Sequence, residues 1–328
     1  MVADTFPKLL MQKAEKYGAK KVALREKEYG IWQEVTWQQY LENVKFFSLG
    51  LIRLGLERGD KVSIIGDNRP EWVYAELAAQ AAGAISVGIY QDSVPKEVAY
   101  VIDHSDSTFV VVEDQEQVDK ILEIRHALPK VKKVVYYDPK GLRNYKDPLL
   151  ISFEAVQDLG REIEGQMPGI FEAGVARGRG DDLAIICYTS GTTGSSKGAM
   201  LTFNNLLSMG RNLTSIDPVK DTDEYVSFLP LAWIGEQMMS LSCGLMVGFT
   251  INFPEEPETV QENIREIGPH VMFSPPRIWE NMLSTVQVKI EDTSRFKRFC
   301  YNRCLPIGER MADCRFRKVR PSLILRAL

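Results

Sequence analysis

A run of glycines, hydroxyl side chains and one lysine lies in the middle of the chain, where residues 188–200 read Y-T-S-G-T-T-G-S-S-K-G-A-M. Glycine permits positive φ angles and lets main-chain N–H groups approach an anion closely, and hydroxyls add rotatable donors. The glycines are Gly191, Gly194 and Gly198. Lys197 has no acidic residue beside it in the run, so its positive charge is available to a polyphosphate. These residue types predict a loop that holds the phosphates of a nucleotide.

The segments on both sides of this run are expected to anchor it. Residues 183–188 form a short continuous apolar run, which is typical of a buried strand. Residues 199–201 can form a second strand, and Thr202 or Asn204 can cap a helix over 205–209. A flexible polar surface turn has a similar composition. The two anchored ends favour the phosphate loop over that alternative.

The spacing of the run argues against two common nucleotide-binding loops. A Walker A loop reads G-x-x-x-x-G-K followed by Ser or Thr, whereas here two residues separate Gly194 from Lys197 and Gly198 follows the lysine. The G-x-G-x-x-G pattern of dinucleotide-binding folds is also missing from the run. We therefore expect neither a P-loop phosphotransferase nor a dinucleotide fold.

The run T-S-G-T-T-G-S-S-K-G, followed by A-M-L-T, resembles the phosphate loop of the AMP-forming acyl-CoA synthetases and their adenylating relatives. Three more stretches resemble segments of the same family in the same order. They are residues 59–72 with G-D-K-V-S-I-I-G-D-N and P-E-W, residues 228–233 with F-L-P-L-A-W, and residues 273–280 with F-S-P-P-R-I-W-E. The resemblance is to the N-terminal part of an adenylate-forming enzyme of the long-chain fatty acid branch.

This resemblance implies roles for individual residues of the loop. The cradle for the β- and γ-phosphates of ATP would consist of Ser190, Gly191, Thr192, Thr193 and Gly194. Lys197 would act as the catalytic positive charge over these phosphates. Thr189 matches the position from which the family offers a hydroxyl to Mg²⁺. One hydroxyl is a poor sole ligand, so phosphates, waters and at least one carboxylate must complete the octahedron.

The resemblance also assigns two residues to the acyl pocket. Trp233 stands where many members have histidine, and an aromatic residue here in the long-chain branch gates the fatty-acid tunnel. Glu236 follows three residues later and would shape the polar end of the pocket. A large core aromatic and a surface glutamate are the alternatives for these two residues.

The implied reaction has two steps and uses ATP and CoA as substrates. A fatty carboxylate attacks the α-phosphorus of ATP to give acyl adenylate and pyrophosphate, and the thiol of CoA then displaces AMP. Carboxylate is already a nucleophile, so the first step needs positioning and charge neutralisation more than a general base. Two alternatives stay open: a non-catalytic fragment that binds a nucleotide or acyl group, and an enzyme that adenylates another carboxylic acid.

Family members continue to a Tyr-Gly-x-Thr-Glu segment, a Thr-Gly-Asp segment and a hinged C-terminal domain with a catalytic lysine. None of these is found before Leu328. We therefore expect the chain to be a large N-terminal domain that ends early, without the small C-terminal domain, and to make no acyl-CoA by itself.

Strand and helix patterns alternate from residue 61 to residue 137, which predicts an α/β fold with mainly parallel sheets flanked by helices. Residues 138–182 change character, with a polar stretch at 140–145, a helix over 153–164, and glycine and arginine without apolar periodicity at 174–180, and are interpreted as a connector. We expect a first α/β subdomain over 1–180, including that connector, and a second, incomplete one over 181–328 that carries the phosphate loop.

Composition adds little beyond a globular enzyme. The chain has 328 residues, a net charge of −4 and five cysteines, one of which must stay unpaired. These values favour a reducing, cytoplasmic compartment and give no reason to expect nucleic acid. Residues 294–328 hold ten Lys or Arg against two acidic residues, so this segment is either a solvated helix packed on the enzyme or a peripheral contact with an anionic membrane. A homodimer is a further association that the sequence allows.

Overall fold

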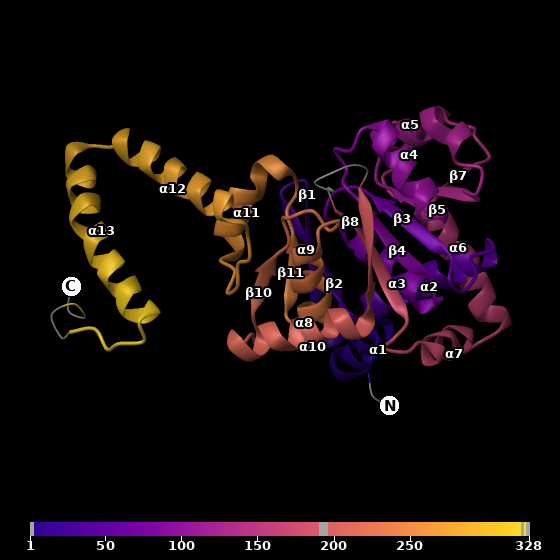
Figure 1. Cartoon of the computed structure of the whole chain (residues 1–328), viewed down its shortest axis with the longest axis horizontal. Coiled ribbons are helices and arrows are strands. Elements are labelled where there is room, and N and C mark those ends of the chain that lie inside the picture. The colour runs from indigo at the N-terminus through magenta and orange to yellow at the C-terminus, as the bar shows by residue number, and fades with distance from the viewer. Residues whose placement is uncertain (1–2, 190–195, 323–324, 326–328) are drawn as a thin grey trace. The chain divides into compact units, whose positions relative to one another are not determined.

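The computed structural model describes residues 3–189, 196–322 and 325. It divides into two compact units, Met1–Met272 and Phe273–Leu328. The first unit contains both β-sheets, and the second contains α12 (Pro276–Glu291) and α13 (Arg295–Phe316), whose N-terminus is capped by the Ser294 side chain. The expected α/β class is confirmed (Figure 1).

A seven-stranded sheet has the order β7-β6-β5-β3-β4-β8-β9. Every neighbouring pair is parallel except β8 and β9, so the prediction of a mainly parallel sheet is confirmed. The strands are β3 (Lys61–Ile65), β4 (Ile85–Ile89), β5 (Ser107–Val112), β6 (Lys133–Tyr136), β7 (Leu150–Ser152), β8 (Leu183–Thr189) and β9 (Lys197–Thr202).

The helices of the first half begin at residues suited to a helix N-terminus. Thr36 caps its helix with a capping box, Thr5 and Ser152 accept from backbone N–H groups, and Pro70 and Pro95 occupy first-turn positions. In space α2 packs against α3 and α6, while α4 packs against α5 (Figure 1). The helices are α1 (Phe6–Tyr17), α2 (Trp37–Arg53), α3 (Pro70–Ala81), α4 (Pro95–His104), α5 (Gln115–Ile124), α6 (Phe153–Gln166) and α7 (Ile170–Arg177).

The region expected to be a connector contributes to the first unit's regular structure. Strand β7 pairs with β6 and extends the seven-stranded sheet, α6 packs on α2, and α7 follows. Helix α7 includes Gly174, where the sequence shows no apolar periodicity. Its buried side chains, Phe171 and Val175, are four residues apart and therefore lie on one helix face.

A four-stranded sheet has the order β10-β11-β1-β2, with β1 (Val22–Glu28), β2 (Ile31–Thr36), β10 (Glu224–Val226) and β11 (Thr250–Phe253). Strand β1 pairs in parallel with β11, Leu24 lying opposite Ile251. Each sheet therefore holds strands from both sides of residue 180, and a subdomain boundary there stays a prediction. The remaining α- and π-helices described in the first unit are α8 (Phe203–Ile216), α9 (Ile234–Glu236), the π-helix η4 (Gln237–Cys243), α10 (Gly244–Val247) and α11 (Val260–Ile267).

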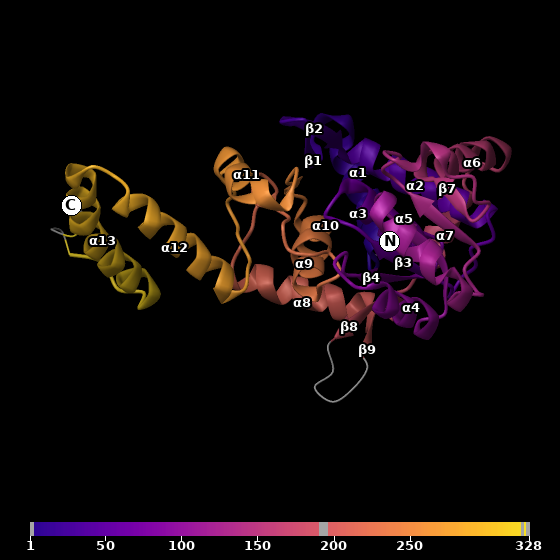
Figure 2. The same cartoon turned by 90° about the horizontal axis from the view of Figure 1, so that it is seen from above.

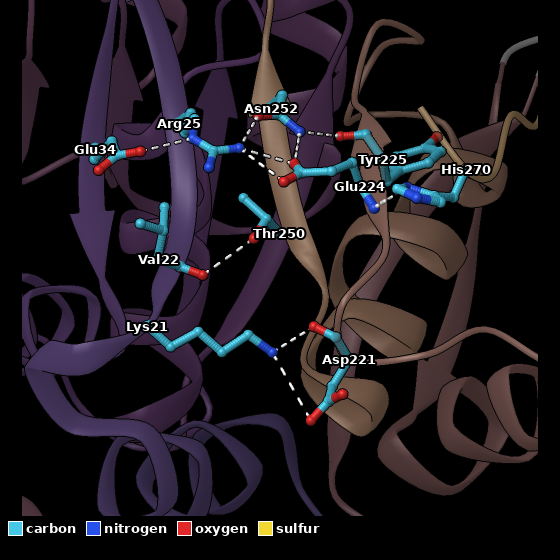
Figure 3. Close-up of polar contacts among 10 residues, drawn as sticks. All are labelled: Lys21, Val22, Arg25, Glu34, Asp221, Glu224, Tyr225, Thr250, Asn252 and His270. Atoms are coloured by element: carbon cyan, nitrogen blue, oxygen red, sulfur yellow. Dashed lines mark hydrogen bonds and ion pairs between the residues drawn. The ribbon is translucent and has the colours of Figure 1, made fainter. Parts of the chain in front are cut away.

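The Arg25 side chain on β1 links three strands of this four-stranded sheet through hydrogen bonds (Figure 3). Its Nη1 donates to both carboxylate oxygens of Glu224 at 2.9 Å, and its Nε donates to Glu34 at 3.0 Å. Asn252 on β11 completes the cluster by donating to the Glu224 carboxylate at 2.8 Å. The planar guanidinium thus joins β1, β2 and β10 in one polar network.

Replacing Arg25 with lysine should destabilise the protein although the charge is kept. A lysine ammonium cannot reach carboxylates on two sides with fixed donors, so we expect a loss of roughly 1–2 kcal/mol in the free energy of unfolding. Urea denaturation measures the loss. Arg53→Lys, at an exposed position in the last turn of α2, is the control, and an equal effect of both variants would show that the network adds nothing.

Candidate functional site

The predicted phosphate loop connects two antiparallel strands, β8 and β9 (Figure 2). Thr189 ends β8 and Lys197 begins β9, and the two lie opposite each other in the strand pairing. Both are exposed. The predicted cradle residues Ser190, Gly191, Thr192, Thr193 and Gly194 lie outside the described residues. Cross-strand pairing therefore holds the hydroxyl assigned to Mg²⁺ and the lysine assigned to the phosphates side by side.

Helix α4 contacts the residues at both ends of the loop. Tyr100 donates its hydroxyl to the carbonyl of Ser196 at 2.9 Å, and His104 Nδ1 lies 2.7 Å from the Tyr188 hydroxyl. The three rings also contact one another. Burial raises the pKa of Tyr188 to about 12. Sequence reasoning missed Tyr100 and left His104 without a role; the one signal was their four-residue spacing on a helix.

Gly198 lacks the positive φ angle that the glycines of the run were expected to supply. The expectation of a positive φ angle is wrong for this residue, which is not among the glycines with that conformation. A Cβ atom at Gly198 would lie 2.7 Å from Cγ2 of Ile186 on β8. Glycine is therefore required for close packing between β8 and β9 rather than for an unusual backbone angle.

The segment that resembles the acyl-pocket motif packs on the strand next to β8. A Cβ atom at Gly88 of β4 would lie 2.8 Å from the Cα atom of Ala232, so the two backbones are in direct contact. Gly88 is paired with Cys187 of β8, two residues before Thr189. The motif and the start of the phosphate loop thus converge at the carboxyl ends of adjacent strands, where open α/β sheets bind ligands.

Trp233 precedes α9 and is partly buried. Its ring covers Gly235, because a Cβ atom there would lie 2.3 Å from Cζ3 and 2.4 Å from Cη2 of the indole. Gly235 therefore leaves the space that the ring occupies. Sequence reasoning missed this residue, since a glycine two positions after a tryptophan carries no signal of its own.

Glu236 is fully buried, which excludes the surface alternative. Its carboxylate accepts hydrogen bonds from the Tyr225 hydroxyl at 2.9 Å and the Ser240 hydroxyl at 2.6 Å. Burial raises the pKa of Glu236 to about 7, against the lowering effect of these hydrogen bonds. The side chain thus belongs to a buried polar network under the acyl-pocket motif, and its role at the end of that pocket stays a prediction.

The raised pKa of Glu236 makes stability depend on pH. The folded state favours the protonated acid, so this group stabilises the fold below its ordinary value of 4.5, and the contribution is lost as the pH rises through about 7. Between pH 5 and pH 8, wild type should lose about 2 kcal/mol more unfolding free energy than Glu236→Gln. Denaturation across that range measures the difference, with exposed Glu97→Gln as control. Parallel pH profiles for wild type and Glu236→Gln would contradict the assignment.

No group of three or more His, Cys, Asp or Glu side chains able to hold a metal ion occurs within residues 3–189, 196–322 and 325. Thr189 is one neutral oxygen donor, whereas Mg²⁺ prefers six oxygens that include carboxylates or phosphates. The described residues alone therefore do not make a magnesium site, and a bound nucleotide would have to supply most of the ligands.

Comparison with known proteins agrees with this geometry. The family model of the AMP-binding enzymes matches residues 10–322. A long-chain-fatty-acid–CoA ligase of Rattus norvegicus is 31% identical over 347 residues, covering 97% of this chain and 51% of the relative. One of Xenopus laevis is 30% identical over 303 residues, covering 90% of this chain and 40% of the relative.

A solved long-chain-fatty-acid–CoA ligase of Archaeoglobus fulgidus has the same fold, with a TM-score of 0.67 at 21% identity over 81% of this chain and 50% of that one. The chain spans about half the length, or less, of the curated relatives it matches. The family model covers nearly all of the chain, and the segment 228–233 lies against β4, next to the strand β8 that leads into the predicted phosphate loop. The chain belongs to the AMP-binding enzyme family.

Proposed function

We propose that the chain is the nucleotide- and acyl-binding part of an AMP-forming long-chain fatty acid–CoA ligase. The observation that carries the proposal is the meeting of two segments at the carboxyl ends of β4 and β8. One is the strand pair at Thr189 and Lys197, which borders the proposed phosphate loop, and the other is the motif that ends at Trp233. A nucleotide and an acyl chain bound there would bring the α-phosphorus and the carboxylate together.

Each residue group has a proposed task in that reaction. The loop cradle from Ser190 to Gly194 binds the β- and γ-phosphates of ATP, and Lys197 offsets their charge as pyrophosphate leaves. Trp233 borders the acyl site and Glu236 supports its polar end. Mg²⁺, if it binds with ATP, supplies further charge neutralisation, and the Thr189 hydroxyl is the proposed protein ligand. CoA is the proposed acceptor of the acyl group.

Pyrophosphate exchange by the full-length protein tests the proposal. With a panel of carboxylic acids, we expect exchange of labelled pyrophosphate into ATP to require a fatty acid and to rise with chain length, and AMP rather than ADP to be released once CoA is added. Exchange that occurs only with short polar acids would contradict the fatty-acid substrate. Release of ADP would contradict adenylation itself.

We also propose that the protein is cytoplasmic and contacts a membrane peripherally. This proposal rests on the basic character of residues 294–328 and on the exposure of Phe296, Phe299 and Phe316. Within the described parts of the chain, every helix is too short or too polar to cross a bilayer. Sedimentation with anionic and neutral vesicles tests the membrane contact, and equal partition to both would contradict it.

A homodimer is a further proposal, and analytical ultracentrifugation tests it.

A further inference from the structure

The segment from Ser227 to Trp233 has no regular secondary structure, because β10 ends at Val226 and α9 begins at Ile234. Such a segment needs other groups to hold its backbone. Here those groups are side chains from the turn after β3, which is distant in sequence, and from the π-helix η4, which follows α9. We call Asn68, Gly88, Gly235 and Gln237 the Trp233 seat.

Both polar atoms of the Asn68 side-chain amide hydrogen-bond to this segment. Its Nδ2 donates to the carbonyl of Leu229 at 2.7 Å and to the Ser227 hydroxyl at 2.9 Å, and its Oδ1 accepts from the N–H of Leu231 at 3.1 Å. A carbonyl can only accept and a backbone N–H can only donate. The orientation of the Asn68 amide is therefore determined by its partners.

Gln237 binds the carbonyl of Leu231, the residue whose N–H donates to Asn68. Its Nε2 donates to the carbonyl of Leu231 at 2.8 Å and to Oε2 of Glu76 at 2.8 Å. Gln237 and Glu76 are both buried. Leu231 thus has its N–H bound by Asn68 and its C=O bound by Gln237, two residues before Trp233. Because the bond from Gln237 is buried, the loss of this donor leaves the Leu231 carbonyl without that partner and away from water.

Close packing removes the remaining freedom of the segment. Ala232 lies against the backbone of Gly88, and the Trp233 indole lies over Gly235. The N–H of Trp233 also donates to the carbonyl of Pro230 at 2.8 Å, which closes a turn. Backbone and ring are therefore both held, and a shift of Leu231 would be transmitted to the indole.

We propose that the Trp233 seat sets the position of the indole and thereby the selection among acyl chains, with Asn68 and Gln237 as positioning residues. This inference rests on the proposed function for its acyl part, since Trp233 is proposed to border the acyl site. Small displacements of a group at a binding site change rates strongly. The seat would therefore act on acyl recognition and leave ATP recognition unchanged.

Fluorine NMR of 5-fluorotryptophan-labelled protein tests the positioning step without any activity. The chain has five tryptophans, and Trp233→Phe identifies the resonance of Trp233. Asn68→Asp keeps the shape and the acceptor but loses the donor to Leu229. We expect it to shift or broaden the Trp233 resonance and to leave those of Trp32, Trp37 and Trp279 in place. Gly235→Ala, which crowds the indole directly, should move the same resonance.

Asn43→Asp is the matched control, because it removes a donor to the carbonyl of Gln39 at 2.9 Å within α2. It should leave the Trp233 resonance unchanged. An unmoved Trp233 resonance in Asn68→Asp and Gly235→Ala would overturn the positioning role. Movement of every resonance together with a lower Tm would show a general role in folding and would also overturn it.

Pyrophosphate exchange by the full-length protein then tests acyl selection. For Asn68→Asp we expect the KM for long-chain acids to rise at least threefold more than the KM for short-chain acids, with the KM for ATP within twofold of wild type. Equal changes for all acids would overturn the selection step. If wild type exchanges with no fatty acid, the proposed function fails, whereas the NMR result still decides the positioning of Trp233.

Discussion

Gly160→Ala is expected to destabilise the protein by about 3 kcal/mol or more, because α2 and α6 pack backbone against backbone. A Cβ atom at Gly160 would lie 1.8 Å from the carbonyl oxygen of Phe46 and 3.0 Å from the nitrogen of Gly50. The reciprocal contact is as tight, since a Cβ atom at Gly50 would lie 1.9 Å from the carbonyl oxygen of Val156. Backbone atoms cannot rotate away, so the helices themselves must separate.

The same helix provides the control. Gly165 also lies in α6, and a Cβ atom there would have no atom within 4 Å. Gly165→Ala should therefore leave the free energy of unfolding unchanged or raise it by up to about 1 kcal/mol through helix propensity. Urea denaturation of both variants measures the contrast. Similar stability of the two variants would show that α2 and α6 do not approach each other as described.

Lys197→Met should lower the rate of pyrophosphate exchange by roughly 100-fold. The residue begins β9 opposite Thr189 and is exposed, so its ammonium can reach an anion bound by the loop. Removal of one preorganised positive donor from a site where negative charge develops typically costs several kcal/mol in the transition state. Methionine keeps most of the side-chain length, and the position is exposed, so folding should be unaffected.

Two comparisons separate this effect from a general loss of charge. Lys96→Met removes an exposed lysine at the start of α4 and should change the rate less than twofold. Lys197→Arg keeps the charge and should retain more activity than Lys197→Met, although the fork of a guanidinium is not the same donor as an ammonium. A wild-type rate for Lys197→Met would exclude it from the phosphate site.

Local structure follows closely from the sequence. The capping threonine at 202 and the apolar run before the proposed phosphate loop predict elements that the structure confirms. These signals act over a few residues, through hydrogen bonds at a helix end or through the periodic burial of apolar side chains. The alternation of strand and helix patterns likewise predicts the mainly parallel sheet.

The sequence by itself thus determined the family and the α/β class, and it predicted the two strands on either side of the proposed phosphate loop. Tertiary structure alone decided the pairing of β1 with β11, the contact of Gly88 with Ala232, and the hydrogen bond from the Leu231 N–H to Asn68. These partners lie more than 100 residues apart in the sequence. A glycine or asparagine looks the same in the local sequence whether it forms a turn or contacts the backbone of a distant segment. Only the packed chain shows which neighbour each one meets, because close approach and buried hydrogen bonds depend on the fold as a whole.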